Sequence, residues 1–328
     1  MESGSSSSKD SLSYTKEDVN KTIVTEFILM AFSSLQHLQI LLFAAILLAY
    51  IICVTGNIFI IALVSAVPLL HTPMYYFICT FAVLEIMFVS DTVPNLLANL
   101  ISGNKKISLL GCFTQMYAFN GLGITECYLL AVMAFDRNLA INNPLHYSTI
   151  MSKVLYIELA VAPWIVGFTI SFMTTIFTAR LKYCGPNKLD HFVCDLAPLQ
   201  KLACSNPFIS RVVTLLAAIL ATVIPFIIII AFYIHIINTI SKIKSSEGKQ
   251  KAFSTCSSHL IVASLYYGTA IIVYVRPNGS QYDKFLALMY TVITPLLNPF
   301  IYTLRNKDVK SAVRKSRLFK RVLGSYPI

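Results

Sequence analysis

The sequence predicts an all-α fold, a bundle of seven transmembrane helices followed by a short amphipathic helix. Apolar residues make up 56% of the 328 residues and charged residues only 12%, which gives more apolar surface than a water-soluble fold of this size can bury. Seven apolar stretches are long enough to cross a hydrocarbon core of roughly 30 Å, which needs about 20 residues of helix. A helix satisfies its own backbone hydrogen bonds, so helices are the expected form in lipid.

The expected spans cover residues 38–64, 74–100, 113–140, 154–177, 208–240, 260–275 and 285–304. The second span has a clear start signal, because Thr72 can cap a helix that Pro73 begins. The sixth span is the least apolar, since the polar run 254–259 precedes it. A helix that faces the bundle would tolerate such a run.

Apolar and basic residues alternate at helical spacing after the seventh span. Val309, Val313 and Phe319 are interleaved with basic residues such as Lys310 and Arg314. This pattern predicts an amphipathic helix on the anionic inner leaflet rather than a nucleic-acid site. The chain then divides into an extracellular tail (1–37), a seven-transmembrane domain (38–304) and a cytoplasmic helix and tail (305–328).

The distribution of charge indicates which side each end faces. Eight Lys and Arg residues lie within residues 305–321, directly after the last span, where the positive-inside effect is strongest. This places the carboxyl terminus in the cytoplasm, and an odd number of spans places the amino terminus outside. The N-glycosylation sequons at Asn20 and Asn278 both fall outside in this arrangement. No removable signal peptide is visible, so we expect the first span to direct insertion into the plasma membrane.

Four of the eight cysteines fall in the outer, oxidising compartment, where disulfides form. Four cysteines allow three pairings, and spacing does not choose among them. The outer cysteines are Cys112, Cys184, Cys194 and Cys204. The others, for which we expect only apolar packing, are Cys53, Cys79, Cys127 and Cys256.

Several polar residues stand within apolar spans, where ionisable groups are costly and usually functional. Glu85 and Glu126 are the clearest, and Asn57 and Asn298 stand at a comparable depth. These side chains could bind sodium or share a proton, or the two glutamates could be a protonated structural pair. Asp91 does not share a face with Glu85, and we assign it no role.

Asp136 and Arg137 form an adjacent charged pair at the inner end of the third span. Pairing with each other and snorkelling to the interface explain them equally well.

Of other function classes, a transporter would predict two related halves, and we find no internal repeat. An enzyme is not expected either, since no span carries paired histidines or a nucleophile with a base in reach.

Four motifs stand in order along the chain: HTPMY at 71–75, MAFDR at 133–137, KAFSTCSSH at 251–259 and PLLNPFIY at 295–302. Together they resemble the signatures of the vertebrate olfactory receptors. The segments 183–187 and 191–195 are similar to the family's long second outer loop. The likeness runs from about Asn20 to the basic tail.

This resemblance implies a rhodopsin-like bundle that couples to a stimulatory, olfactory-type G protein and so to cAMP. It also implies disulfides Cys112–Cys194 and Cys184–Cys204. Asp136 and Arg137 would hold the resting state, and Arg137 would meet the G protein. The full set implied in coupling and activation is Asp136, Arg137, Tyr233, Lys251, His259, Asn298, Pro299 and Tyr302, and the implied sodium or proton site is Asn57, Glu85, Glu126 and Asn298.

The resemblance further implies an odorant cavity among the outer halves of the spans. Its expected lining is Phe119, Asn120, Gly123, Ile124, Ala217, Ala218, Tyr267, Tyr274, Leu288 and Thr291. These residues are mostly apolar and suit a small organic molecule without a cofactor. The third span has no carboxylate at the depth of Phe119 to Ile124, so we disfavour a cationic amine as ligand.

This chain departs from the family pattern at three positions. Asn138 stands where tyrosine is usual, Asn142 where cysteine is common, and Phe232 where serine is usual. These departures bear on coupling efficiency rather than on fold. A chemosensory receptor of the same fold outside olfaction is the main alternative reading, and the sequence does not identify the ligand.

Overall fold

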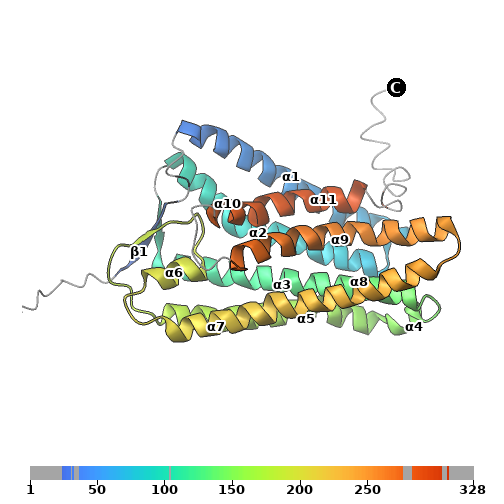
Figure 1. The fold of residues 1–328 in the computed structure, drawn as a ribbon. Helices are drawn as coiled ribbons and strands as arrows, with labels where there is room; N and C mark the ends of the chain where they lie inside the picture. Colours follow the sequence, from blue (N-terminus) through green and yellow to red (C-terminus); the bar gives the residue numbers. More distant parts are fainter. Residues whose placement is uncertain are drawn as a thin grey trace, which may run out of the picture.

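The computed structural model describes residues 24–30, 32, 37–102, 105–275, 283–304 and 309, and in these ranges seven long helical segments lie side by side (Figure 1). The segments are α1 (Gln39–Ala66), α2 (Pro73–Ser102), α3 (Leu109–Asn142), α5 (Lys153–Ala179), the run α7 (Phe208–Ala218), η3 (Ile219–Val223) and α8 (Ile224–Lys242), then α9 (Ser246–Val275), and last the run α10 (Asp283–Leu288), η4 (Met289–Ile293) and α11 (Thr294–Leu304). Six of them are long and apolar enough to cross a bilayer. The predicted bundle is therefore confirmed.

The exception is α9, which also differs most from its expected span. The helix begins at Ser246 rather than at residue 260, because the polar run before the span is itself helical. Cys256, Ser257 and His259 are buried in the bundle. These three side chains thus face protein instead of lipid, and the polar run makes this helix less apolar than the other spans.

The other helices match the expected spans and extend them by a few residues. α2 begins at Pro73, as the start signal predicted, and the Thr72 carbonyl accepts a hydrogen bond from Tyr76 N at 3.1 Å. α3 begins four residues before its expected start, at Leu109, because Ser108 caps it by accepting from Gly111 N at 3.1 Å. The predicted amphipathic helix after α11 lies almost wholly outside the described residues.

The shorter elements join the long helices at the two ends of the bundle. At one end lie η2 (Pro68–Leu70) and α4 (Tyr147–Ile150), and at the other lies α6 (Leu196–Leu202). The α6 end also carries a small sheet in the order β2–β1–β3, formed by β1 (Glu26–Leu29), β2 (Lys106–Ser108) and β3 (Lys188–Leu189). β1 is antiparallel to β2 and parallel to β3.

The sheet was not predicted from the sequence, since its strands are only two to four residues long. Two disulfides lie at the same end of the bundle. Cys112 on α3 is bonded to Cys194, and Cys184 is bonded to Cys204, the pairing that the resemblance implied. The long loop between α5 and α7 is therefore fastened to the top of α3 and to itself.

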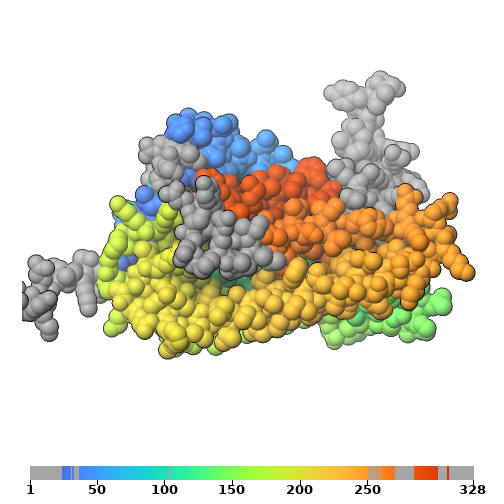
Figure 2. All heavy atoms as spheres, in the orientation of Figure 1, coloured from blue at the N-terminus to red at the C-terminus, as the bar shows by residue number. Residues whose placement is uncertain are grey.

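Apolar side chains on the outside of the bundle mark its lipid-facing surface. The run from α7 to α8 crosses the whole face seen in Figure 2 (yellow to light orange), and it has the highest mean hydropathy of the spans, 3.0. Only 22% of its most apolar window is buried in the protein. Large exposed side chains such as Leu215, Ile227 and Ile237 therefore face outward, as expected in a hydrocarbon solvent.

Two π-helical turns interrupt the outer halves of the spans. Pro225 lies two residues after the end of η3, and Pro295 lies two residues after the end of η4. A proline has no N–H for the preceding turn, so wider turns form at these points. Both turns contain residues that lie close to the cavity described below.

The backbones of α3 and α5 approach each other very closely at two glycines. A Cβ atom on Gly167 would lie 2.3 Å from Thr125 Oγ1 and 2.7 Å from the carbonyl oxygen of Gly121. The Thr125 hydroxyl donates to that same carbonyl at 2.7 Å. Ser171 adds a hydrogen bond from its Oγ to the Tyr117 carbonyl at 2.7 Å. Small and hydroxyl residues thus fix the spacing of these two helices.

We predict that Gly167→Ala lowers stability by about 1–3 kcal/mol, because the added methyl group forces α5 away from α3. The measurement is the midpoint of thermal unfolding of the purified receptor, together with its level at the cell surface. Gly268→Ala is the matched control, since a Cβ there meets nothing within 4 Å. Equal midpoints for the two variants would contradict the proposed close contact.

Candidate ligand cavity and coupling site

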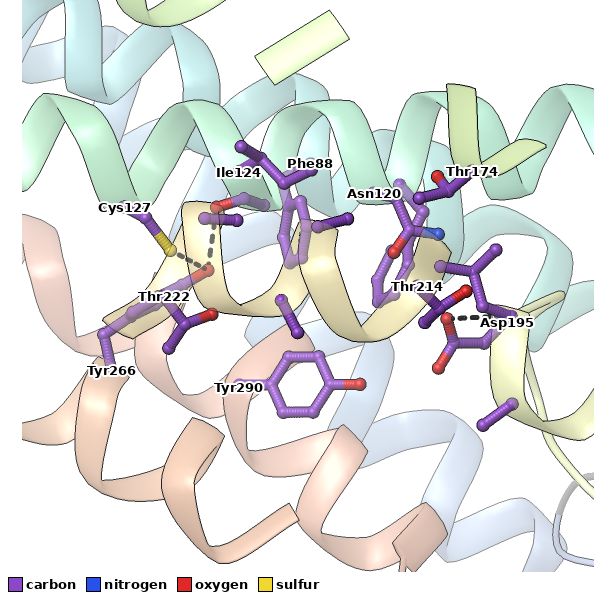
Figure 3. Close-up of a pocket in the computed structure, with 17 residues that line it drawn as sticks. Phe88, Asn120, Ile124, Cys127, Thr174, Asp195, Thr214, Thr222, Tyr266 and Tyr290 are labelled. Carbon is purple, nitrogen blue, oxygen red and sulfur yellow. Dashed lines mark hydrogen bonds between the residues drawn. The ribbon is translucent and has the colours of Figure 1, made fainter. Parts of the chain in front are cut away.

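A cavity of about 110 Å³ lies in the half of the bundle that carries the disulfides (Figure 3). Its wall is built by α2, α3, α5, α6, the α7–η3 run, α9 and η4. Phe88 and Phe119 stack with their ring centroids 5.2 Å apart, and Tyr290 follows at 6.2 Å from Phe119. One side of the cavity is therefore aromatic.

The structure places six of the ten expected ligand residues in this wall: Phe119, Asn120, Gly123, Ile124, Ala217 and Ala218. Three others are elsewhere. Tyr267 is buried and donates to the Cys127 carbonyl at 3.1 Å, Thr291 donates to the Ala287 carbonyl, and Leu288 packs in an apolar cluster beside the cavity. Tyr274 has a side chain outside the described part of the structure. Ligand contact by the six stays a prediction.

Several donors of the wall are engaged in hydrogen bonds with backbone carbonyls. Asn120 Nδ2 donates to the Met116 carbonyl at 2.9 Å, and Thr174 Oγ1 donates to the Ser171 carbonyl at 3.0 Å. At the inner end, the Tyr266 hydroxyl donates to the Gly123 carbonyl at 2.9 Å. Figure 3 shows Tyr266 and Cys127 at this end and Asn120, Thr174, Thr214 and Asp195 at the other.

Sequence reasoning missed several lining residues, and Asp195 is the most consequential. It belongs to the loop between α5 and α7 and caps α6, with Oδ1 accepting from Leu196 N at 2.8 Å. The sequence placed this residue in a long outer loop but gave no indication that the loop reaches into the bundle. The available signal was the preceding residue, Cys194, because its disulfide to Cys112 on α3 draws this part of the loop to the bundle.

Around the cavity the loop is held by buried polar contacts. His191 is buried, its ring lies 4.8 Å from that of Phe192, and Val193 N donates to its Nδ1 at 3.2 Å. Burial lowers the pKa of His191, and the nearby Asp195 and Asp190 carboxylates act in the opposite direction. Asp190 forms an ion pair with Lys284 on α10 at 2.6 Å. This pair connects the loop to the top of the seventh span.

A polar cluster lies deeper in the bundle. Asn298 on α11 donates to Glu85 on α2, while Glu85 Oε2, Glu126 Oε1 and Asn298 Oδ1 are buried without a hydrogen-bond partner among the described residues. Glu85 and Glu126 are close enough for their charges to interact. Asn57 is buried too, but its Nδ2 donates to the Cys53 carbonyl of its own helix at 3.0 Å. Three of the four expected side chains thus share this site.

Asp91 is separate from this cluster and from the cavity wall. Its backbone carbonyl accepts from Gln115 Nε2 at 3.1 Å, and its Oδ2 is buried with no partner among the described residues. The structure gives us no physical account of this carboxyl group.

At the inner end of α3, Asp136 and Arg137 are both buried, and their side chains pair at 3.6 Å. The sequence left open whether these side chains pair with each other or extend to the membrane interface, and in the structure they pair. Tyr147 on α4 donates to the other oxygen, Asp136 Oδ1, at 2.6 Å. Burial and the Asp136 carboxylate raise the pKa of Tyr147, so it remains a neutral donor. The sequence did not indicate this partner.

Other residues expected in coupling lie near the same end. The Tyr233 hydroxyl and His259 Nδ1 are 2.6 Å apart, with their rings stacked at 5.8 Å. Asn298 and Pro299 are buried on α11. The side chains of Lys251 and Tyr302 lie outside the described residues, as do Asn20 and Asn278. Roles in coupling and glycosylation therefore stay predictions.

Two of the three departures from the family pattern meet in one network between α3 and α8, here called the α3–α8 clasp. Asn142 Nδ2 donates to Asn138 Oδ1 at 2.7 Å, and His235 Nδ1 lies 3.0 Å from that oxygen. Thr239 Oγ1 donates to Asn142 Oδ1. Phe232, the third departure, packs its ring 5.7 Å from that of Phe135.

Comparison with known proteins agrees with this architecture. The family model described as olfactory receptor matches residues 46–320. Human olfactory receptor 10A7 is 45% identical over 300 residues, covering 90% of this chain and 95% of that receptor. Human olfactory receptor 11L1 is 45% identical, covering 91% and 94%, and mouse olfactory receptor 6E1 is 45% identical, covering 90% and 96%. The chain therefore belongs to the olfactory receptor family and is a multi-pass, odorant-binding G-protein-coupled receptor rather than an enzyme.

Proposed function

We propose that this receptor binds a small, mostly apolar odorant in the described cavity and responds by activating a stimulatory, olfactory-type G protein, which raises cAMP. One observation carries the proposal: α3 is a single helix that lines the cavity at one end and holds the Asp136–Arg137 pair at the other. Gly123 and Arg137 are 14 residues apart, about 21 Å at 1.5 Å per residue. A rigid element thus joins the ligand site to the inner face.

A receptor of this kind exchanges between a resting and an active arrangement of its helices. A ligand shifts the balance between them only if it contacts the two arrangements differently. The cavity wall meets this condition, because it includes residues of η3 and η4, the turns where the helical hydrogen bonding changes. Movement of these turns against α3 would change the cavity and the inner face together. The cavity is small, about 110 Å³, and therefore suits a small organic molecule.

We further propose that the cavity end of the bundle faces outward and the Arg137 end faces the cytoplasm. Both disulfides lie at the cavity end, and disulfides persist in oxidising compartments. β1 pairs with β2 and β3 at this end, which supports an extracellular tail for residues 1–37. Residues 305–328 would then lie in the cytoplasm of a receptor in the plasma membrane.

The cluster of Glu85, Glu126 and Asn298 fits a sodium ion or a shared proton. Three of its oxygens are buried with no partner among the described residues, and hard cations prefer oxygen ligands. A proton shared between the two carboxyl groups would also relieve their repulsion. Either occupant would stabilise the packing of α2, α3 and α11.

We predict that Arg137→Ala abolishes at least 90% of the odorant-induced cAMP signal in cells, because it removes the buried cation beside Asp136. An odorant panel with a cAMP reporter provides the measurement, and flow cytometry corrects for receptor at the surface. Arg180→Ala is the control, since Arg180 is exposed at the opposite end of the bundle. A surface-expressed Arg137→Ala variant with an undiminished response would contradict the coupling role.

We predict that Asn142→Ala raises ligand-independent cAMP about two- to fivefold. The change removes hydrogen bonds of the α3–α8 clasp, each worth roughly 0.5–1.5 kcal/mol, so the inner ends of α3 and α8 separate more easily. Asn143→Ala is the matched control, because Asn143 is the exposed neighbour at the helix end. A lower basal signal would show that the clasp belongs to the active arrangement instead.

A further inference from the structure

We infer that the ligand of this receptor carries a primary amine, whose ammonium group lies against Asp195 while its hydrocarbon part lies among the aromatic residues of the cavity. The inference rests on the proposed function in one respect, that this cavity is the ligand site. It reverses the expectation drawn from the sequence, which looked for a carboxylate on the third span and found none. The structure supplies one from the outer loop.

Asp195 has a carboxylate oxygen available for a ligand. Oδ1 accepts from Leu196 N, whereas Oδ2 accepts no hydrogen bond from any described residue. Among the described side chains, no Lys, Arg or His forms an ion pair with it. The neighbouring Lys284 forms its ion pair with Asp190 instead, and His191 is buried with a lowered pKa. A negative charge therefore borders the cavity without a cationic partner in this part of the chain.

The position of Asp195 is fixed by the residue before it. Cys194 is bonded to Cys112 on α3, and its backbone N–H donates to Gln115 Oε1 at 3.2 Å. Cys194 and His191 are both buried. The loop therefore holds the carboxylate against the bundle before a ligand arrives, which reduces the entropy lost on binding.

Several groups beside Asp195 can accept a hydrogen bond. Asn120 and Thr174 donate hydrogen bonds to backbone carbonyls of their own helices, and their side-chain oxygens remain able to accept. Thr214 Oγ1 accepts from Gln200 Nε2 at 2.9 Å. An ammonium group has three donors and no acceptor, so it matches this end of the cavity. An aldehyde or ketone only accepts, and a carboxylate would also be repelled by Asp195.

The rest of the cavity suits a short alkyl chain. Phe88 and Ile124 lie between the Asp195 end and the Tyr266 end (Figure 3), and Phe119 stacks against Phe88. The cavity is small, about 110 Å³, so it suits a short chain better than a long one. Alkylamines titrate near pH 10, as lysine does, so the ligand is cationic at neutral pH.

The test uses the purified full-length receptor and three probes of equal chain length: n-butylamine, butan-1-ol and butanoate. Binding to the folded state raises the unfolding midpoint with the logarithm of ligand concentration over Kd, and Trp164, the single tryptophan, reports unfolding by its fluorescence. We expect n-butylamine to bind at least tenfold more tightly than butan-1-ol, and butanoate to bind least. The concentration dependence of each shift gives the apparent affinity.

Asp195→Asn removes the charge and retains an oxygen that can cap α6. We expect it to weaken n-butylamine binding at least tenfold and to change butan-1-ol binding less than threefold. Asp190→Asn is the matched control, since it removes a carboxylate of the same loop outside the cavity wall, and it should preserve the preference for the amine. Asp195→Ser, which also retains a capping oxygen, repeats the test if the first variant folds poorly.

The inference is overturned if wild-type receptor binds the amine no better than the alcohol, including the case in which neither shifts the midpoint. It is also overturned if the Asp195 variants keep the preference. A cAMP assay separates this question from signalling. Amine binding without any cAMP response would leave the inference standing and contradict the proposed coupling, whereas odorant responses without amine selectivity would do the reverse.

Discussion

The structure depends on one constraint, that a polar group inside a bilayer must find its partner within the protein. Most of the buried hydroxyls obey it by donating to backbone carbonyls one turn away or on a neighbouring helix. Thr125 bonds Gly121, Ser171 bonds Tyr117, and Tyr267 bonds Cys127. Bonds of this kind join α3 to α5 and to α9. Glu85 Oε2 and Glu126 Oε1 have no partner among the described residues, which supports a functional role for this pair.

α3 is the element on which these requirements converge. Its outer end is fixed by the disulfide to Cys194, its middle lines the cavity and supplies Glu126, and its inner end carries the Asp136–Arg137 pair. Four functions on one straight element explain why so many of its residues are buried. They also explain why changes at one end are felt at the other, since a continuous helix cannot shift at one point alone.

The sequence alone was sufficient to predict the helices, because apolar length is a direct consequence of bilayer thickness. Residues that project inward from long helices, such as Asn120 and Ala217, were also placed well by the resemblance. Three kinds of feature were missed. The sheet depends on long-range pairing of very short strands, Asp195 depends on where a disulfide draws a loop, and Tyr147 belongs to a single helical turn outside the spans. None of these contacts leaves a periodic pattern.

The close approach at Gly167 bears on how such receptors could diversify. Gly167 touches the same stretch of α3, residues 121–125, whose opposite face opens into the cavity at Gly123 and Ile124. Thr174, two turns further along α5, is itself in the cavity wall. A bulkier residue at Gly167 would therefore push α5 away from α3 and widen the cavity between them. The range of odorants that a receptor accepts could therefore evolve through Gly167, while every residue that contacts the odorant stays the same.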